Sequence, residues 1–335
     1  MGIRRFAGIS TADLPAGNPA VREVIAEVPL FESQNPRMAA LLETARRAAA
    51  GDTTILLTGE SGTGKDVLAH QIHRWSPRRD GPFVVINCTT LAEPLLENEL
   101  FGHIRGAFTG AVNDRPGRLE AANGGTVLFD EIAELPISLQ TKFLRFIQER
   151  SFERIGSSHT IKVDVHLLAA SNRNLEAEVA AGRFREDLYY RLNVITFTLP
   201  PLRERPQDIL PLAEWILKEV SVTAKRPQLR LSPEAAEVLA GYRWPGNVRE
   251  LHNTLERAVA LARTETITFD DLPDSIRHPG SGTFIPTAHG TRLRDFEREH
   301  IVRVLAESPT LEVAALTLGI NVTTLWRKRR HYGLA

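Results

Sequence analysis

One short glycine-rich motif constrains the fold of this chain more than any other feature. It reads Gly59-Glu60-Ser61-Gly62-Thr63-Gly64-Lys65 and lies between a β-branched run at residues 54–58 and a helical pattern at residues 66–73. A glycine-rich turn between a buried strand and a helix points backbone N–H groups at phosphate oxygens, aided by the helix dipole. The lysine adds a positive charge for the β- and γ-phosphates. The motif therefore predicts a P-loop nucleotide-binding domain, and an ordinary turn with a solvated lysine is the weaker interpretation.

Short apolar segments alternate with helical patterns along the first two hundred residues. The predicted strands lie at residues 54–58, 83–86, 127–129, 165–169 and 194–199. Such alternation predicts an α/β domain with a parallel sheet. After Pro200-Pro201 the periodicity is helical only: Ser232-Pro233 has the pattern of a helix start, and residues 246–262 form a long amphipathic pattern.

Composition shifts divide the chain into five segments. We expect a tail or linker remnant at residues 1–30, the α/β ATPase subdomain at 31–201, a helical lid at 202–273, a flexible linker at 274–291 and a small all-α unit at 292–335.

Charge and cysteine content argue against a strongly basic, a disulfide-bonded or a membrane-spanning protein. The 41 basic and 41 acidic side chains balance, so no net field draws the whole chain to nucleic acid or to a membrane. The single cysteine, Cys88, excludes an internal disulfide and is expected to be a buried, inert thiol. Because the N-terminus has no long apolar run, we expect neither a signal peptide nor a membrane span, and hence a cytoplasmic protein.

Two adjacent carboxylates end one of the predicted strands. Asp130 and Glu131 follow the apolar residues 126–129. Asp130 is suited to binding Mg²⁺, and Glu131 can orient or deprotonate a water molecule for attack on the γ-phosphate of ATP. The residue after the P-loop lysine is Asp66, where Ser or Thr usually binds the metal. Magnesium is therefore expected to depend more on Asp130 and on water.

An apolar segment with a glycine near each end lies between the P-loop and these carboxylates. It reads Gly106-Ala107-Phe108-Thr109-Gly110-Ala111. An exposed aromatic residue on a glycine-hinged loop suggests contact with another molecule. The alternative is that Phe108 packs into its own subunit. A second insertion, at residues 152–163 with a turn at Gly156-Ser157, predicts a β-hairpin.

Residues 311–328 have the pattern of a helix-turn-helix. Ala315 is small where two helices would cross, Gly319 can form the turn, and Ile320 and Leu325 can pack the pair. Residues at the start of a recognition helix meet base edges, and basic residues neutralise phosphates. The predicted DNA contacts are Asn321, Thr323, Thr324, Arg327, Lys328 and Arg330. A helical cap with a solvated basic face is the alternative, and a helix beginning near Leu293 is a candidate dimerisation element.

Together these motifs resemble the AAA+ activators of sigma-54 RNA polymerase, the NtrC-type bacterial enhancer-binding proteins, over about residues 30 to 335. The C-terminal unit resembles their Fis-type module, and residues 324–334 resemble the subgroup that regulates alginate synthesis. The resemblance implies an AAA+ fold and ATP hydrolysis with Mg²⁺. It also implies a homo-oligomer, from dimer to hexameric ring, that binds upstream double-stranded DNA and the sigma-54 holoenzyme. Members of this family commonly carry an N-terminal sensing or phosphoacceptor domain, and residues 1–30 are too short for one. We therefore expect control by a partner in trans, constitutive activity or a truncated form.

The resemblance also gives roles to residues outside the P-loop. Asn87 matches the switch asparagine that pairs with the catalytic glutamate, here Glu131. Ser171-Asn172 match sensor I, with serine where the family usually has threonine. The remaining matches are Arg185 and Arg191, the arginine fingers that reach a neighbouring subunit, and Arg249, sensor II on the lid.

Three functions are consistent with this pattern. In the family, the loop at residues 106–111 engages sigma-54, its ATP-driven motion remodels the closed promoter complex, and the hairpin supports it. One alternative is a DNA-binding AAA+ regulator that acts on ordinary promoters. Another is an AAA+ remodeller such as a chaperone or helicase loader, against which the helix-turn-helix argues. The intact six-residue loop favours the sigma-54-dependent activator.

Overall fold

The computed structural model describes residues 33–89, 91–226, 229–278, 301–302, 304–305, 308 and 310–332. The chain divides into two compact units, residues 1–280 and 281–335. The predicted tail at residues 1–30, most of the predicted linker and the start of the candidate dimerisation helix near Leu293 lie outside the described residues.

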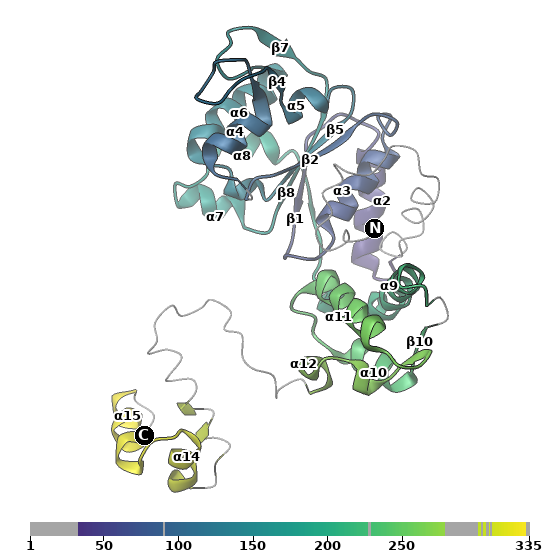
Figure 1. Cartoon of the computed structure of the whole chain (residues 1–335), viewed down its shortest axis with the longest axis vertical. Coiled ribbons are helices and arrows are strands. Elements are labelled where there is room, and N and C mark those ends of the chain that lie inside the picture. Colours follow the sequence, from purple (N-terminus) through teal and green to yellow (C-terminus); the bar gives the residue numbers. More distant parts are fainter. Residues whose placement is uncertain are drawn as a thin grey trace. The chain divides into compact units, whose positions relative to one another are not determined.

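The first unit contains a five-stranded parallel sheet with the strand order β2-β5-β8-β1-β9 (Figure 1). Its strands are β1 (Ile55–Thr58), β2 (Phe83–Asn87), β5 (Thr126–Asp130), β8 (His166–Ser171) and β9 (Ile195–Thr198). All neighbouring strands run parallel, with Leu57 opposite Ala170 and Val85 opposite Leu128. The predicted parallel α/β core is confirmed.

Alternate residues of the strands face two separate hydrophobic cores. On β1, Ile55 and Leu57 belong to one core and Leu56 to the other. Helices cover both faces of the sheet, so the strands are apolar along their whole length rather than on one side. Figure 1 shows α2 and α3 on one face and α4, α6 and α8 on the other. The helices of this subdomain are α2 (Pro36–Ala48), α3 (Lys65–Trp75), α4 (Glu93–Phe101), α5 (Arg118–Ala121), η3 (Ile132–Glu134), α6 (Ile137–Glu149), α7 (Leu175–Ala180) and α8 (Glu186–Leu192).

Two small antiparallel pairs extend from the core. β3 (Gly102–His103) pairs with β4 (Arg115–Pro116), and β6 (Ser151–Glu153) pairs with β7 (Thr160–Lys162). The second pair confirms the hairpin predicted at residues 152–163. A bridge between His103 and Ile155 joins the two pairs at their bases.

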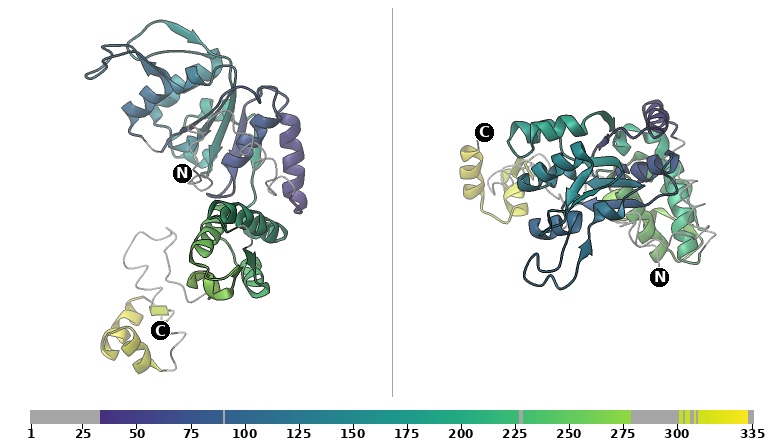
Figure 2. Two further views of the ribbon diagram at one scale, coloured as in Figure 1. Left: turned by 45° about the vertical axis from the view of Figure 1, so that its right-hand side comes forward. Right: turned by 90° about the horizontal axis from the view of Figure 1, so that it is seen from above.

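A helical lid follows the sheet and shares one of its cores. Figure 2 (left) shows the lid as a helical layer below the sheet. Ser232 accepts a hydrogen bond from the Ala235 N–H and so caps α10, as its sequence pattern predicts. The elements of the lid and of the link before it are η4 (Leu202–Glu204), η5 (Pro206–Asp208), α9 (Ile209–Thr223), β10 (Arg230–Leu231), α10 (Pro233–Gly241), α11 (Asn247–Leu261), β11 (Thr266–Ile267), η6 (Phe269–Asp271) and α12 (Asp274–Arg277).

The predicted start of the flexible linker at Asp274 is wrong. Residues Asp274–Arg277 form the helix α12, because Ile276 is 2% exposed and packs in the core of the lid. A single apolar residue among polar neighbours gives no periodic signal, so the sequence pattern missed this turn.

The second unit contains the predicted pair of helices, α14 (Leu311–Thr317) and α15 (Val322–His331). Ala314, Ala315 and Leu325 are buried in a small core. Gly319 has a φ of +65° at the turn between the helices, a conformation that favours glycine. These contacts agree with the predicted helix-turn-helix.

Within the described residues, none of the helices is both long and apolar enough to cross a bilayer. Cys88 is 3% exposed, and burial raises the pKa of its thiol, as expected of an inert cysteine.

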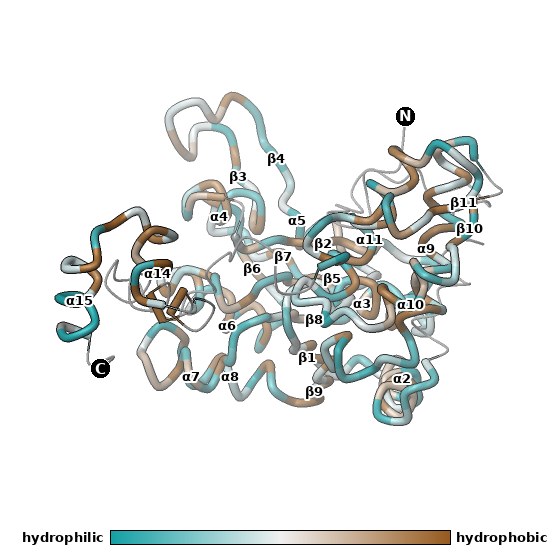
Figure 3. Tube along the Cα trace, turned by 90° about the horizontal axis from the view of Figure 1, so that it is seen from below, coloured by the Kyte–Doolittle hydropathy of each residue, from teal (hydrophilic) through white to brown (hydrophobic). Residues whose placement is uncertain are grey.

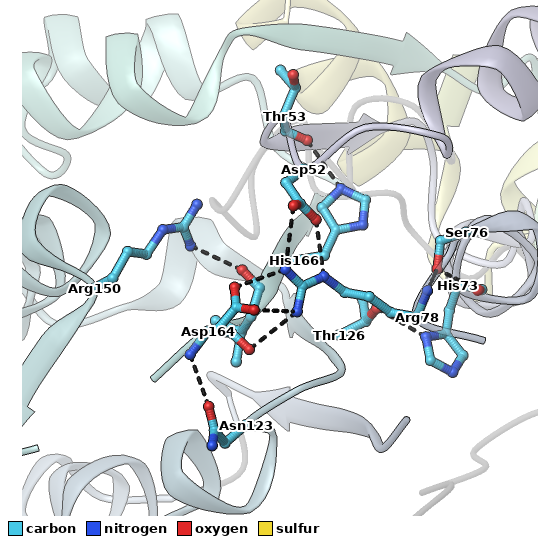
Figure 4. A network of polar contacts seen from close by, with 11 residues as sticks. Asp52, Thr53, His73, Ser76, Arg78, Asn123, Thr126, Arg150, Asp164 and His166 are labelled. Atoms are coloured by element: carbon cyan, nitrogen blue, oxygen red, sulfur yellow. Dashed lines mark hydrogen bonds and ion pairs between the residues drawn. The ribbon is translucent and has the colours of Figure 1, made fainter. Parts of the chain in front are cut away.

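A network of charged residues lies at the amino ends of β1 and β8 (Figure 4). Arg78 Nε donates to Asp52 Oδ1 at 2.9 Å, and its Nη2 donates to Asp164 Oδ1 at 2.7 Å. The two carboxylates precede β1 and β8, so one guanidinium ties the starts of two strands together. Nearby, His73 Nδ1 lies 2.8 Å from Thr126 Oγ1, and His166 Nε2 lies 3.0 Å from the Thr53 carbonyl oxygen.

Burial lowers the pKa of three histidines close to this edge. Desolvation lowers the pKa of His70 and of His73 to about 4 and also lowers the pKa of His166. In the unfolded chain these rings titrate near their ordinary value of about 6.5. Between these values the folded state binds fewer protons than the unfolded state.

The free energy of unfolding is therefore expected to be independent of these rings above about pH 6.5 and to fall as the pH drops toward 4. His70 and His73 can each contribute up to about 1.4 kcal/mol per pH unit in that window. Urea unfolding of the wild type and of His73→Gln between pH 7 and pH 5 measures the effect. The variant, which has no group to protonate at this site, should lose less stability over that range. Equal losses in the two proteins would contradict the prediction.

Candidate active site

The P-loop joins the end of β1 to the start of α3 in a conformation that depends on its glycines. Gly62 has a φ of +79°, and a Cβ atom added there would lie 2.4 Å from the Gly246 carbonyl oxygen. Gly64, with a φ of +97°, is the N-cap of α3. The sequence pattern correctly placed this loop between a strand and a helix.

Lys65 is buried at the centre of the loop, with 6% of its surface exposed. Its Nζ donates to the carbonyl oxygens of Gly59 at 2.9 Å and Glu60 at 3.1 Å. Burial lowers the pKa of this lysine, and the nearby carboxylates of Glu131 and Asp130 oppose that shift. A phosphate would be a stronger partner for the ammonium group than two neutral carbonyls.

The carbonyl side of the P-loop is held by the first turn of α11. The Gly62 carbonyl oxygen accepts from the N–H of Val248 at 2.9 Å and of Arg249 at 3.3 Å. Asn247 Nδ2 donates to the Ser61 carbonyl at 3.0 Å. The lid thus binds the carbonyl oxygens of Ser61 and Gly62 on one side of the loop. A phosphate would be bound by N–H groups of the loop.

Several residues of this contact were missed by the sequence analysis. Asn247 is fully buried with a φ of +53°, and its Oδ1 accepts from the Leu202 N–H at 2.8 Å. Arg203 forms an ion pair with Glu60, and Arg205 Nη2 donates to the Thr63 carbonyl at 3.0 Å. Only the position of Asn247 between Gly246 and the predicted sensor II residue Arg249 could have pointed to it. Arg249 itself reaches the loop, since its Nη1 donates to Ser61 Oγ at 2.7 Å.

The paired carboxylates lie at the carboxyl end of β5. Asp130 Oδ1 accepts from the Glu131 N–H at 3.0 Å, and Glu131 Oε2 accepts from the Asn172 N–H at 3.1 Å. Glu131 has a φ of +52°, an unfavourable conformation for a residue with a side chain. The structure therefore brings Glu131 and the predicted sensor I residue Asn172 together. Ser171 is fully buried, and its Oγ donates to the Arg173 carbonyl.

Asn87 is adjacent to this pair, but its side chain points to a different partner. It lies opposite Asp130 in the register of β2 and β5. Its Oδ1 accepts from the N–H of Thr89 at 2.8 Å and from Thr89 Oγ1 at 2.6 Å. The hydrogen bond between Asn87 and Glu131 that the resemblance implies is therefore absent from the described structure.

The residues around Lys65 fit a magnesium ion that is shared with phosphates. Burial and, to a smaller extent, the nearby carboxylates of Glu131 and Asp66 together raise the pKa of Asp130 to about 6. Mg²⁺ prefers oxygen ligands and in nucleotide sites uses one or two carboxylates together with phosphate oxygens and water. Within the described chain, no three His, Cys, Asp or Glu side chains are grouped to hold a metal by themselves. The phosphates would thus have to complete the coordination.

A pocket opens between the P-loop and the lid. Its apolar lining is formed by Val67 on α3, Trp215 and Ile216 on α9, and Val248 on α11, and Asp66, Arg249 and His252 also line it. Apolar and aromatic walls beside a phosphate-binding loop suit a flat, largely apolar group such as a nucleoside base.

The predicted arginine fingers lie at the two ends of α8. Arg185 is the N-cap residue and forms an ion pair with Asp187 at 2.8 Å, with 41% of its side chain exposed. Arg191 lies in the last turn of the helix and is also exposed. Exposure leaves both guanidinium groups accessible to a second molecule.

The predicted interaction loop at residues 106–111 connects β3 and β4. Phe108 is 45% exposed, and its ring contacts that of His103 edge to face, with 4.9 Å between centroids. Gly106 and Gly110 have positive φ, and a Cβ atom at either position would meet no atom within 4 Å. At Gly156, by contrast, an added Cβ would lie 2.8 Å from Ala107 Cβ, so the hairpin tip touches this loop. Figure 3 shows brown, apolar stretches at the far end of the loop.

The predicted DNA contacts lie on α15. Asn321 is the N-cap, and its Oδ1 accepts from the Thr324 N–H at 2.7 Å and from Thr324 Oγ1 at 2.8 Å. These two side chains therefore also stabilise the helix start. Thr323, Arg327 and Arg330 are exposed, and Lys328 is half-buried. The Arg330 guanidinium lies 5.7 Å from the centre of the Trp326 ring.

Three consecutive parts of the chain match known protein families. Residues 31–198 match the sigma-54 interaction domain, residues 203–285 the AAA+ ATPase lid domain, and residues 292–332 the Fis family of bacterial regulatory proteins.

Whole-chain comparisons agree with these matches. The alginate biosynthesis transcriptional regulatory protein AlgB of Pseudomonas aeruginosa is 51% identical over 304 residues, which cover 91% of this chain and 68% of the relative. The regulatory protein AtoC of Escherichia coli is 44% identical over 310 residues, which cover 90% and 67%. Among solved structures, NtrX from Brucella abortus in complex with ATP matches with a TM-score of 0.70 at 33% identity, over 94% of this chain and 72% of that one.

Gly62→Ala should weaken nucleotide binding by about tenfold or more, because its Cβ would push the first turn of α11 off the P-loop. Gly182→Ala is the matched control: Gly182 also has a positive φ, but a Cβ there meets nothing within 4 Å. Titration calorimetry with ATP measures both. Similar affinities for the two variants would show that the close approach at Gly62 does not matter.

Proposed function

The chain belongs to the sigma-54-dependent transcriptional activators, which join an AAA+ ATPase to a Fis-type DNA-binding domain, and we propose that it opens promoters by coupling ATP hydrolysis to motion of the loop at residues 106–111. Its AAA+ domain binds ATP, and sigma-54 and DNA are its partners. The finer steps below are our proposal for this chain.

ATP binds with its phosphates on the N–H side of the P-loop and its base in the pocket beside Trp215 and Val248. Lys65 then exchanges the carbonyl oxygens of Gly59 and Glu60 for phosphate oxygens. Arg249, already at Ser61, is close enough to the loop to contact the bound nucleotide. Burial of Lys65 keeps these contacts dry, which strengthens each charge interaction.

Asp130 would hold Mg²⁺, with Asp66 as a nearby second carboxylate. Bound metal would keep Asp130 ionised, because a cation lowers the pKa of an adjacent carboxyl. The metal neutralises phosphate charge when it is present. Glu131, held by the Asn172 N–H, orients and deprotonates the water that attacks the γ-phosphate.

Arg185 and Arg191 complete the site of a neighbouring subunit in a ring, which is six-membered by resemblance. This proposal is supported by the exposure of both guanidinium groups at the ends of α8. A guanidinium stabilises the charge of a transferring phosphoryl group and can raise turnover by about 10³–10⁵-fold. Hydrolysis would then require assembly.

The observation that best supports this proposal is the short connection along the chain from the nucleotide site to the loop at residues 106–111. Asn87 ends β2 opposite Asp130, and the next element, α4, leads through β3 directly into residues 106–111. If the γ-phosphate draws Asn87 from Thr89 toward Glu131, the displaced segment is the one that begins α4. Phe108, already half-exposed, would then be pressed against sigma-54.

The C-terminal unit is proposed to hold the ring near its promoter by binding upstream DNA through α15. Thr323 and the exposed Arg327 and Arg330 are suited to base-edge and phosphate contacts. Since the target is promoter-bound polymerase, we propose that the protein acts in the cytoplasm.

Regulation of ordinary promoters, without remodelling of sigma-54, is the second candidate. The observation against it is that all six residues of the loop are intact and that the aromatic ring is exposed. Both candidates bind DNA and hydrolyse ATP, so only the function of the loop separates them.

Thr109→Ala should abolish open-complex formation on a sigma-54 promoter while leaving ATPase activity and DNA binding largely unchanged, since Thr109 is exposed on the loop. Open complexes are measured with purified protein, ATP and sigma-54 holoenzyme. Val112→Ala, at an exposed position just outside the six residues, is the control and should remain active. Full activation by the Thr109→Ala variant would favour the second candidate.

Arg185→Ala and Glu131→Gln should each reduce ATPase activity by about 10³-fold or more when pure. A mixture of the two should regain part of the activity, because an Arg185→Ala subunit still offers Glu131 and its Glu131→Gln neighbour offers Arg185. Turnover of mixtures at fixed total concentration measures this complementation. Mixtures no more active than the pure variants would place the arginine in its own subunit's site.

A further inference from the structure

Arg205 is a buried cation with unused hydrogen-bond donors. It lies in the link between the sheet and the lid, between η4 and η5, and none of its surface is exposed. Its Nη2 donates to the Thr63 carbonyl oxygen of the P-loop, but its Nε and Nη1 have no hydrogen-bond partner. A guanidinium has five N–H donors, so this one is far from satisfied.

The carboxylate of Asp208, one turn further along, is the natural partner for these donors. It is 5% exposed, and its charge partly offsets the burial that lowers the pKa of Arg205 to about 10. Both of its oxygens are used elsewhere. Oδ2 accepts from Ser33 Oγ, and Oδ1 accepts from the Gln34 N–H at 2.9 Å.

The two residues on Asp208 come from the segment that enters α2. Asn35 extends the same contact, since its Nδ2 donates to the Glu204 carbonyl at 3.0 Å. Three polar contacts therefore seat this segment on the link that carries Arg205. Ser33 is half-buried, so its hydroxyl gives up some water contact when it binds Asp208.

From this juxtaposition we propose that Arg205 is a positioning residue for the P-loop and that its hold on the Thr63 carbonyl depends on the seating of Ser33 and Gln34 on Asp208. While the segment is seated, the carboxylate is occupied and Arg205 stays on the loop. Once the segment leaves, the freed carboxylate binds Nε and Nη1 of Arg205 and draws the guanidinium away from Thr63.

As a consequence, the segment at Ser33 and Gln34, just before α2, would control the affinity of the P-loop for ATP. Thr63 directly precedes Gly64 and Lys65, so loss of its carbonyl partner loosens the part of the loop that meets the phosphates. Anything that pulls Ser33 and Gln34 from Asp208 would weaken ATP binding. The inference rests on the proposed ATPase function and adds a control point to it.

A double-mutant cycle in the full chain tests the proposal. Titration calorimetry with Mg²⁺ and a non-hydrolysable ATP analogue gives the Kd for wild type, Ser33→Ala, Asp208→Asn and the double variant. Ser33→Ala should raise Kd by about three- to tenfold, and it should have no further effect once Asp208 is Asn, because the competing charge is gone. Arg37→Ala is the control, since it breaks only the exposed ion pair between Arg37 and Glu204 in the same junction.

Steady-state ATPase assays separate an effect on ATP binding from a general loss of structure. Ser33→Ala should raise KM for ATP and leave kcat nearly unchanged, with little change in the unfolding midpoint. Arg205→Lys should also raise Kd and no longer respond to Ser33→Ala, because lysine keeps the charge but not the fork of donors. If this buried variant does not fold, the double-mutant cycle between Ser33 and Asp208 still tests the proposal.

An unchanged Kd for Ser33→Ala, or an equal rise with and without Asp208, would overturn the inference while leaving the ATPase function intact. A wild-type chain that does not bind the analogue would overturn the proposed function and the inference with it.

Discussion

The contact on which the site depends is the docking of the first turn of α11 on the carbonyl side of the P-loop. Gly62 and Ser61 give their carbonyl oxygens to Val248, Arg249 and Asn247, and this can happen only because Gly62 has no Cβ. With these two carbonyls bound by the lid, the loop can offer N–H groups and Lys65 to a phosphate. The same hydrogen bonds fix the lid against the sheet, so any change in the phosphates acts on both. Each bond is worth only about 1 kcal/mol, which keeps the lid movable.

The loop at residues 106–111, by contrast, has few contacts with the rest of the domain. A Cβ atom added at Gly106 or Gly110 would meet no atom within 4 Å, and the half-exposed ring of Phe108 contacts that of His103 edge to face. Few contacts mean a low cost of displacement, as expected of a segment that must move. The hairpin tip at Gly156 is the exception, since it touches Ala107 closely and so limits the positions open to the loop. The P-loop is thus held by many hydrogen bonds from the lid, whereas the loop at residues 106–111 exposes an aromatic ring.

Sequence patterns predicted the strands and the P-loop closely because both depend on local chemistry. A buried parallel strand such as residues 126–129 is a continuous apolar run, and a phosphate loop needs its glycines in fixed positions. Contacts across the chain were not predictable in this way. Asn247 and Arg205 reach the P-loop from more than a hundred residues away, and neither differs from an ordinary polar residue in its local sequence. The helix at residues 274–277 was not predicted for the same reason, since Ile276 is buried by lid residues that are distant in the sequence.

By itself the sequence determined that this chain would form a parallel sheet with a phosphate-binding loop, a helical lid and a separate helix-turn-helix, because periodicity and glycine placement are local properties. Which side chains meet was decided by the tertiary structure. Asn87 bonds to Thr89 instead of Glu131, and Asp208 bonds to Ser33 and Gln34 and leaves Arg205 with unused donors. The physical reason is that hydrogen bonds form between groups that folding brings within about 3 Å, and residues distant in the chain carry no local mark of that proximity.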